Sequence, residues 1–485
     1  MKTNTLDFDA QALRDRILDL AMRGKLVPQD PNDEPACELL KKIEAEKAEL
    51  VKEKKIKKSK PLPAITDDEK PFNIPDSWEW VRFSELFNIE GGSQPPKSTF
   101  SDTGGKGKIR LFQIRDYGEN PVPVYIPIDK AKKISQIGDI LLARYGASLG
   151  KVFFAEYGAY NVALAKVLFN FKSEDFILKK YLFYYFKSEL YQNFVRSNSR
   201  SAQAGFNKSD LNRLVFPVPP ISEQKRIAAK IAQLFALLRK VESSTQQYAE
   251  LQTLLKSKVL NLAMRGKLVK QDPNDEPASV LLEKIKGEKA ELAKEKKIKK
   301  SKPLPPITDE EKPFDIPDSW EWVRLESVCD EIGDIDHKMP RKTINGQYLY
   351  ISPKDFTKNG IDYDHAKRIS EDDFKKLSQK FLPKKGDLIF PRYGTIGIIR
   401  KINTERPVLV SYSCCLIRSN KNMSNDFIQY ELKSKITKKE IDKYVNRSTQ
   451  PNVGLKSIKS FLFPLPPLEE QKRIVSKIIE LFSLL

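Results

Sequence analysis

The sequence is poor in the residues on which many enzymes and secreted domains depend. Its 485 residues include only two histidines, His337 and His365, and both lie in the second half of the chain. A Ser-His-Asp or Cys-His arrangement present in both halves is therefore excluded, and a metal cluster is not expected. The four cysteines, at positions 37, 329, 414 and 415, form no C-x-x-C pair. This favours a reducing cytoplasm, with no disulfide framework and no zinc site.

Long apolar runs and cofactor-binding motifs are missing too. No run of 18 apolar residues occurs and the first residues lack the apolar core of a signal peptide, so we expect neither a membrane span nor secretion. The stretch GGKGK from Gly104 lacks P-loop spacing, and no glycine-rich dinucleotide motif follows a strand. The stretches VPPI and LPPL lack the polar residue of an amino-methyltransferase motif, and no carboxylate cluster recurs in both halves. These absences weigh against an enzyme.

Positive charge is what the chain has in excess. It contains 85 lysines and arginines against 65 acidic residues, for a net charge of +20. Such a balance suits a polyanionic partner, most simply nucleic acid. Lysine-rich helices that only face solvent are the alternative explanation.

An internal repeat is the most informative feature of the sequence. Residues 21–82 align without gaps to residues 263–324, with 52 identities in 62 positions. The copies then diverge and realign at two pairs of stretches: GDILLARYG from Gly138 with GDLIFPRYG from Gly386, and FPVPPISEQKRI from Phe216 with FPLPPLEEQKRI from Phe463. Each half is thus a variable segment of about 140 residues between near-constant ones. This pattern is typical of two equal docking surfaces combined with two different recognition surfaces.

The near-constant segments have helical periodicity. Apolar residues recur every three or four positions from Ile227 to Leu262, which predicts a helix of about 40 residues. At 1.5 Å per residue it would span roughly 60 Å. Because one small domain cannot enclose such a helix, we expect a spacer within a coiled coil. A second, charged helix is predicted from Glu38, with a twin from Val280, and an extended proline-rich link follows each.

The two ends of the chain complete the repeat. Residues 7–26 match only the rear half of the long helix, and residues 468–485 match only its front half. We therefore expect the two ends to meet and close a pseudo-dimer with an approximate two-fold axis. Two variable domains would lie at opposite ends of an antiparallel helical spacer.

The variable segments are predicted to be α/β domains with a small, mostly antiparallel or mixed sheet. Residues 151–171 and 406–420 have the composition of strands, whereas 175–197 and 426–448 have amphipathic helical patterns. The predicted organisation is an N-terminal helical segment (1–70), a first recognition domain (71–220), a central helical spacer (221–312), a second recognition domain (313–467) and a C-terminal helix (468–485).

Two pairs of loops are candidates for contact with DNA. One pair begins at Arg144 and Arg392 (RYGASLG, RYGTIG), and the other begins at Arg200 and Arg447 (RSAQAGFNKSDL, RSTQPNVGLKSI). A guanidinium on a glycine turn can contact phosphate, and glutamine or asparagine can read base edges. The alternative is that the glycines serve only the turn. Shared residues should contact the DNA backbone. Base readers should be among positions that differ, such as Gln94, Lys97 and Arg115 against Lys338, Arg341 and Lys342. The predicted DNA-binding residues are Gln94, Lys97, Arg115, Arg144, Tyr145, Arg200, Gln203, Asn207, Lys208, Lys338, Arg341, Lys342, Arg392, Tyr393, Arg447, Gln450 and Asn452.

These motifs, in this order and written twice, resemble the specificity subunit of type I restriction-modification systems. The resemblance rests on the two LAMRGKL segments, the two PDSWEWVR stretches, the GDILLARYG and GDLIFPRYG stretches, and the two EQKRI exits. It implies two target-recognition domains separated by long antiparallel helices, each domain reading one half of an asymmetric, gapped DNA site. It also implies docking of two methyltransferase subunits, which carry S-adenosylmethionine, and of motor-nuclease subunits, which use ATP and magnesium. This subunit would bind no cofactor and catalyse nothing itself.

The physical expectations agree with the resemblance. A spacer of fixed length would separate the two half-sites by a fixed number of unread base pairs, while its lysines neutralise phosphates over that gap. Two alternatives remain open: a self-contained restriction enzyme with its own nuclease or methyltransferase centre, and a protein-only scaffold with basic helices.

Overall fold

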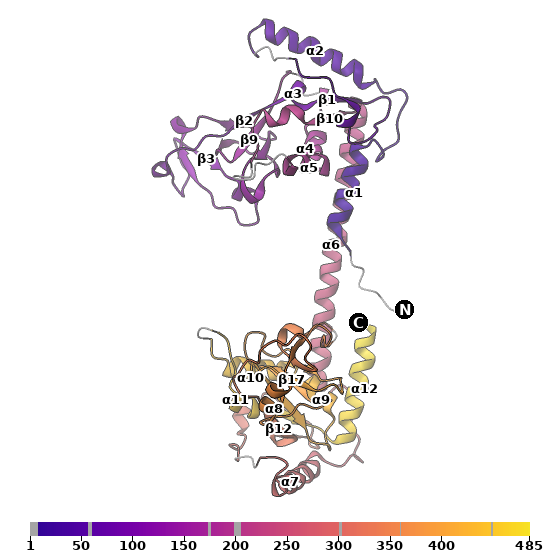
Figure 1. Ribbon diagram of the computed structural model, residues 1–485, viewed down its shortest axis with the longest axis vertical. Helices are drawn as coiled ribbons and strands as arrows, with labels where there is room; N and C mark the ends of the chain where they lie inside the picture. Colours follow the sequence, from indigo (N-terminus) through magenta and orange to yellow (C-terminus); the bar gives the residue numbers. More distant parts are fainter. Residues whose placement is uncertain are drawn as a thin grey trace. The chain divides into compact units, whose positions relative to one another are not determined.

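Two compact units make up the chain. The computed structural model describes residues 8–56, 61–172, 176–197, 205–299, 303–358, 360–447 and 450–485 (Figure 1). Unit 1 spans Met1–Thr245 and unit 2 spans Gln246–Leu485. The boundary between them falls within the longest helix, α6. The exact limits of the five predicted segments stay predictions.

The helices outside the variable segments agree with the sequence pattern. α6 covers Ile221–Ala263, which confirms the predicted helix of about 40 residues. The charged helix and its twin are α2 (Ala36–Lys52) and α7 (Ala278–Lys294), and the chain ends carry α1 (Ala10–Met22) and α12 (Leu468–Leu484). All five begin and end within one or two turns of their expected positions.

Each unit contains one antiparallel pair of these helices. In unit 1, α1 lies along the first part of α6, where Arg14 is ion-paired with Glu242, and the loop after α1 reaches back to α6 through the Asp33–Arg226 ion pair (Figure 1). In unit 2 the last part of α6 packs with α12 in one core, and Asp275 is ion-paired with Arg473. The pairing of a front and a rear half-helix is therefore present twice. A continuous coiled-coil spacer and closure of the chain ends stay predictions.

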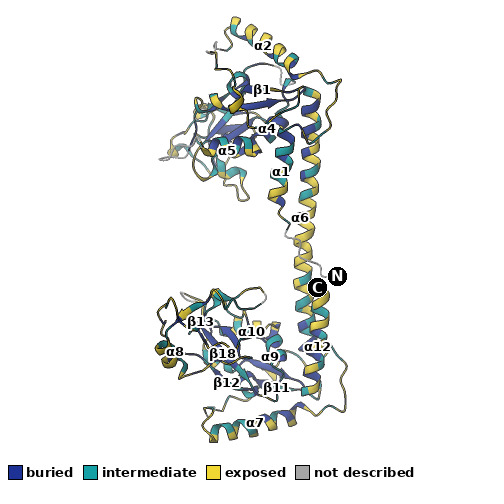
Figure 2. Ribbon diagram, turned by 45° about the vertical axis from the view of Figure 1, so that its right-hand side comes forward, coloured by how far each residue is buried: buried dark blue, intermediate teal, exposed yellow. Residues whose placement is uncertain are grey.

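The two ends of α6, which pair with α1 and α12, contribute buried residues, whereas its middle is exposed. Ile227, Ile231 and Phe235 belong to the core of unit 1, and Leu260 and Ala263 to that of unit 2. Figure 2 shows the middle of α6 as exposed, including the apolar residues Val241, Tyr248, Leu251, Leu254 and Leu255.

The variable part of unit 1 is built on antiparallel and mixed sheets. One four-stranded sheet has the order β2-β9-β6-β7, and a second has the order β4-β3-β8-β5 with β3 and β8 parallel. A two-stranded antiparallel sheet, β1 with β10, joins the start and end of the segment. The strands are β1 (Glu79–Arg82), β2 (Phe87–Gly91), β3 (Lys108–Phe112), β4 (Tyr125–Pro127), β5 (Ile134–Ser135), β6 (Ile140–Ala143), β7 (Val152–Phe154), β8 (Gly158–Tyr160), β9 (Leu164–Phe169) and β10 (Val215–Val218).

Unit 2 repeats this arrangement with small changes. Its sheets have the orders β12-β18-β15-β16 and β14-β13-β17, again with one parallel pair, β13 and β17, and β11 pairs with β19. The strands are β11 (Glu321–Arg324), β12 (Cys329–Gly333), β13 (Tyr348–Ile351), β14 (Lys367–Ile369), β15 (Leu388–Pro391), β16 (Arg400–Lys401), β17 (Val408–Val410), β18 (Cys414–Ser419) and β19 (Leu462–Leu465). The prediction of α/β domains with mixed sheets is confirmed in both units.

One prediction about the variable segments was wrong. Each expected amphipathic helix is two helices that meet at a serine. In unit 1 they are α4 (Lys179–Lys187) and α5 (Glu189–Ser197), with Ser188 in an extended conformation between them. In unit 2 they are α9 (Asn425–Glu431) and α10 (Lys435–Tyr444), where the Ser434 hydroxyl caps α10. A serine that bonds backbone groups competes with the helix, which explains both breaks. The remaining helices are α3 (Phe83–Leu86), α8 (Glu371–Ser378) and α11 (Leu455–Lys459).

Candidate nucleic-acid interface

Shared residues hold the base of each variable segment in one orientation. In unit 1 the buried Glu223 accepts hydrogen bonds from Trp78 Nε1 at 2.8 Å and from Gln29 Nε2 at 2.6 Å. In unit 2 Glu470 accepts the same bonds from Trp320 and Gln271 at 2.9 and 2.6 Å. Burial raises the pKa of both carboxyl groups, and these hydrogen bonds oppose the rise.

This network gives the near-constant segments an internal role. It ties the PDSWEW stretch, the QDPND loop and the start of the EQKR helix to one another. Sequence reasoning assigned those segments to docking and did not identify the network. The shared spacing of the three motifs in both copies is the signal that could have revealed it.

In unit 1 the ends of three strands meet at one edge, which is called the exit edge below. The chain leaves β2, β3 and β6 there, and the loop between β8 and β9 connects them. Backbone hydrogen bonds run from Asn161 N to Phe112 O (3.0 Å), from Arg144 N to Ala163 O (2.9 Å) and from Gly92 N to Leu164 O (2.9 Å). Residues from four separate parts of the sequence are therefore brought together.

Unit 2 forms the same edge with equivalent bonds. Ser411 N donates to Ile351 O at 2.7 Å, and Arg392 N donates to Ser413 O at 2.8 Å. Here the chain leaves β12, β13 and β15. Most of the predicted DNA-binding residues lie on segments that begin at these two exit edges.

Within each unit the two loops predicted to contact DNA lie side by side. Tyr145 forms an antiparallel bridge with Gly205 in unit 1, and Tyr393 forms one with Asn452 in unit 2. The sequence predicted that both loops contact DNA but did not predict that they touch each other. Arg200 and Gln203 lie outside the described residues.

Arg144 of unit 1 lies at the exit edge without a carboxylate partner among the described residues. Its Nε donates to the carbonyl oxygen of Phe206 at 3.3 Å, and the guanidinium lies 5.0 Å from the centre of the Tyr145 ring. It crosses Gly91, where a Cβ atom would come within 2.5 Å of Nη1. The guanidinium is half-buried and retains hydrogen-bond donors for an anion.

Arg392, its counterpart in unit 2, is instead held by an acid. It is 5% exposed, and its Nη2 donates to Asp334 Oδ2 at 2.6 Å. Lys380 Nζ donates to the other oxygen of Asp334 at 2.6 Å. Because the guanidinium is buried and paired, its predicted contact with phosphate finds no support in this geometry.

The other predicted residues are mostly exposed. Those of unit 1 are Gln94, Lys97 and Arg115, and those of unit 2 are Lys338, Arg341, Lys342, Arg447 and Gln450. Arg447 is ion-paired with Asp442 at 3.3 Å. Asn207 and Asn452 are half-buried. Lys208 does not join the exit edge, because it lines a hollow together with Leu40 and Lys47 of α2.

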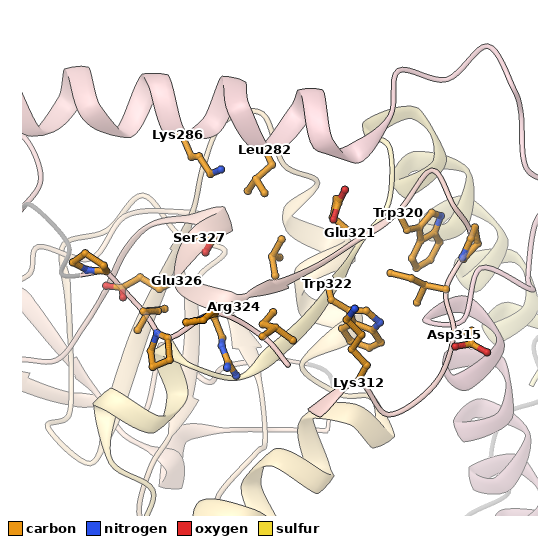
Figure 3. Close-up of a pocket in the computed structure, with 18 of the residues that line it drawn as sticks. Leu282, Lys286, Lys312, Asp315, Trp320, Glu321, Trp322, Arg324, Glu326 and Ser327 are labelled. Carbon is orange, nitrogen blue, oxygen red and sulfur yellow. The ribbon is translucent and has the colours of Figure 1, made fainter. Parts of the chain in front are cut away.

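A groove also lies beneath α7 in unit 2. Figure 3 shows Leu282 and Lys286 projecting from α7 toward β11, where Trp322 and Arg324 lie. The proline-rich link forms its remaining wall. In unit 1 the matching residues line two smaller hollows. The groove combines apolar and basic side chains that are nearly the same in both copies.

Within the described residues, no group of three or more His, Cys, Asp or Glu side chains is placed to hold a metal ion. The helices of that part of the chain also include none with the length and apolarity needed to cross a bilayer.

The model of the type I restriction modification DNA specificity domain matches residues 75–252 and 317–484, which is well over half of the chain. The chain belongs to the family of type I restriction-modification specificity subunits. Each match begins just before the shared strand β1 or β11 and includes one exit edge.

Relatives of this specificity subunit cover almost all of its length. It is 35% identical to the EcoAI specificity subunit of Escherichia coli, over 98% of this chain and 89% of that one. It is 32% identical to the EcoEI specificity subunit of the same organism, with the same coverage. A solved chain from a study of complex assembly and conformational transition of a type I system has a TM-score of 0.55 at 19% identity. That likeness covers 85% of this chain and 92% of the solved one, and it concerns the fold.

Proposed function

We propose that this specificity subunit reads an asymmetric, gapped site in double-stranded DNA, with one half-site at each exit edge. The observation that carries the proposal is that two equivalent edges share two backbone hydrogen bonds between matching positions but present different side chains. Equal scaffolds with unequal surfaces suit two DNA segments of the same shape and different sequence. The net charge of +20 supports contact with phosphate.

The proposal assigns different roles to the predicted residues. Arg144 and the neighbouring Tyr145 contact the DNA in unit 1, whereas Arg392 supports the edge of unit 2 through Asp334. The exposed cations Lys338, Arg341 and Lys342 supply the positive charge in unit 2.

Catalysis belongs to partner subunits in this proposal. Two methyltransferase subunits, which carry S-adenosylmethionine, dock on surfaces that both units share, and motor-nuclease subunits, which use ATP and magnesium, join through them in the cytoplasm. Nearly identical grooves under α2 and α7 suit two copies of one partner. The specificity subunit itself holds no cofactor.

A segment exchange in the full complex tests the proposal. Residues 83–214 are replaced by the corresponding segment of a relative with another target. The two ends of this segment are adjacent, since Phe83 N donates to Leu214 O at 2.8 Å, and the β1–β10 pair stays intact. Sequencing of methylated sites should find one half-site changed and the other unchanged. A change in both halves would contradict the two-edge proposal.

The self-contained restriction enzyme is tested on the purified chain alone. Binding of S-adenosylmethionine, or cleavage of duplex DNA, by this subunit without partners would favour that alternative.

A further inference from the structure

One short turn at each exit edge carries a cation in both units. In unit 1 it follows β3 and contains Arg115, and in unit 2 it follows β13 and contains Lys354. Sequence comparison did not pair these residues, because the flanking letters, QIRD and SPKD, differ.

The two turns have the same construction. The Asp116 carboxylate accepts a hydrogen bond from Gln113 N at 2.7 Å, and that of Asp355 accepts one from Ser352 N at 2.7 Å. The first residues of the two turns have φ and ψ of −126° and 164°, and of −132° and 170°. The equivalence of Arg115 and Lys354 is therefore geometric.

The position of the turns is also the same. Just before each turn, the carbonyl oxygen of Phe112 or Ile351 accepts a hydrogen bond from a backbone N–H of the loop between β8 and β9 or between β17 and β18. The same loop accepts a hydrogen bond from the backbone N–H of Arg144 or Arg392. Each cation is thus attached to the exit edge by short, rigid backbone.

The cation of each turn faces solvent. Arg115 and Lys354 are exposed, and neither has an ion-pair partner among the residues that the structure describes. The acid of each turn accepts backbone hydrogen bonds, and Asp116, whose side chain is fully buried, is also ion-paired with Arg110 at 3.5 Å. The exposed charged group of each turn is therefore its cation.

From this we infer that Arg115 and Lys354 are equivalent contacts to the phosphate backbone, one for each half-site. The inference rests on the proposed function. An arginine and a lysine replace each other here, which suits a contact to charge more than a base-edge contact with fixed fork geometry. Lys354 is thereby added to the interface, and Arg115, predicted as a base reader, becomes a contact to phosphate.

The experiment uses the assembled methyltransferase complex and the variants Arg115→Gln and Lys354→Gln. Matched controls are Lys106→Gln and Lys376→Gln, exposed lysines in the turn before β3 and on α8. Both lie near the starts of β3 and β13, whereas the two turns follow the ends of these strands, since Lys108 opens β3 and α8 follows the Ile369 end of β14, which pairs with Tyr348. DNA affinity is measured as a function of salt concentration, on the sequence that the complex methylates and on DNA with base changes in one half-site.

Each turn variant should weaken binding several-fold, equally on all sequences. It should also lower the slope of log K against log salt by about 0.9. Arg115→Lys and Lys354→Arg, which keep the positive charge, should have the wild-type slope. This comparison distinguishes the loss of a charge from a disturbance of the fold. The controls should behave as wild type.

Two results would overturn the inference. If both Gln variants kept the wild-type salt slope, Arg115 and Lys354 would face solvent without contacting phosphate. If a Gln variant lost discrimination at one base pair, the replaced residue would read a base. A wild-type complex that does not prefer its methylated site would instead reject the proposed function.

Discussion

Unit 1 and unit 2 use one scaffold for two different electrostatic designs. The edge that leaves Arg144 without an acid in unit 1 contains Asp334 in unit 2, at the position where unit 1 has Gly91. A single acid therefore changes the arginine of the same RYG motif from an available donor to a buried partner. A shared motif therefore does not guarantee a shared role, because the role of its arginine depends on a residue that follows a different strand.

The largest expected effect separates these two arginines. Arg392→Ala should destabilise unit 2 by about 3 kcal/mol, because it leaves the buried Asp334 with an incomplete set of partners. Arg144→Ala should leave the stability of unit 1 almost unchanged and weaken DNA binding. Hydrogen exchange of β15 and of β6 measures the two stabilities within one protein. Equal destabilisation by both variants would remove the proposed difference.

A second contrast concerns a buried site at the break between two helices. Three residues before the serine, unit 1 has the buried Tyr185 and unit 2 has the buried Glu431. Burial raises the pKa of Glu431 to about 8 from 4.5, although Thr437 Oγ1 lies 3.1 Å from each of its oxygens. The nearby Glu440 adds to the rise. Tyr185 instead donates to the carbonyl oxygen of Val215 at 2.7 Å.

The sign of the pH effect follows from this shift. The folded state holds the Glu431 proton more tightly than the unfolded state, so the stabilisation is complete below pH 4.5 and is lost as pH rises toward 8. Unit 2 should therefore lose stability between pH 5 and 8, by at most about 1.4 kcal/mol per pH unit. Glu431→Gln should abolish this loss, and unit 1 should not show it. Exchange rates of α9 measured across that pH range provide the test, and a pH-independent wild type would contradict it.

The smallest expected effect is a symmetric one. Glu223→Gln and Glu470→Gln replace the acceptor that holds a tryptophan and a glutamine in each unit. Both should cost about 1 kcal/mol, since the amide keeps one oxygen acceptor and turns an NH2 group toward the second donor. Thermal unfolding of the two variants compares them directly. Clearly unequal losses would show that the repeated junctions are not energetically equivalent.

Much of the fold was predictable because the two copies of the repeat can be aligned with each other. The limits of α6, the twin helices and the mixed sheets all follow from patterns of local periodicity and composition. The helix breaks at Ser188 and Ser434 were missed, because apolar spacing continues across both serines while their hydroxyls bond the backbone.

The candidate site was predictable only in part. Arg144, Tyr145 and Tyr393 were selected from their motif, and the structure places them at the exit edges. Lys354 was missed because the spacing between equivalent residues is 242 at β11, 239 at the turn and 248 at the RYG motif. Such insertions remove the sequence signal while the backbone hydrogen bonds preserve the position.

By itself the sequence determined the repeat, the helices that pair in each unit and the junction motifs, since each of these depends on local periodicity or on a gapless register. Only the tertiary structure decided which cations face solvent and which are paired. Asp334 and Arg392 lie 58 residues apart. Their ion pair exists because two strands of one sheet end at the same edge, where the carboxylate can replace water around the buried guanidinium.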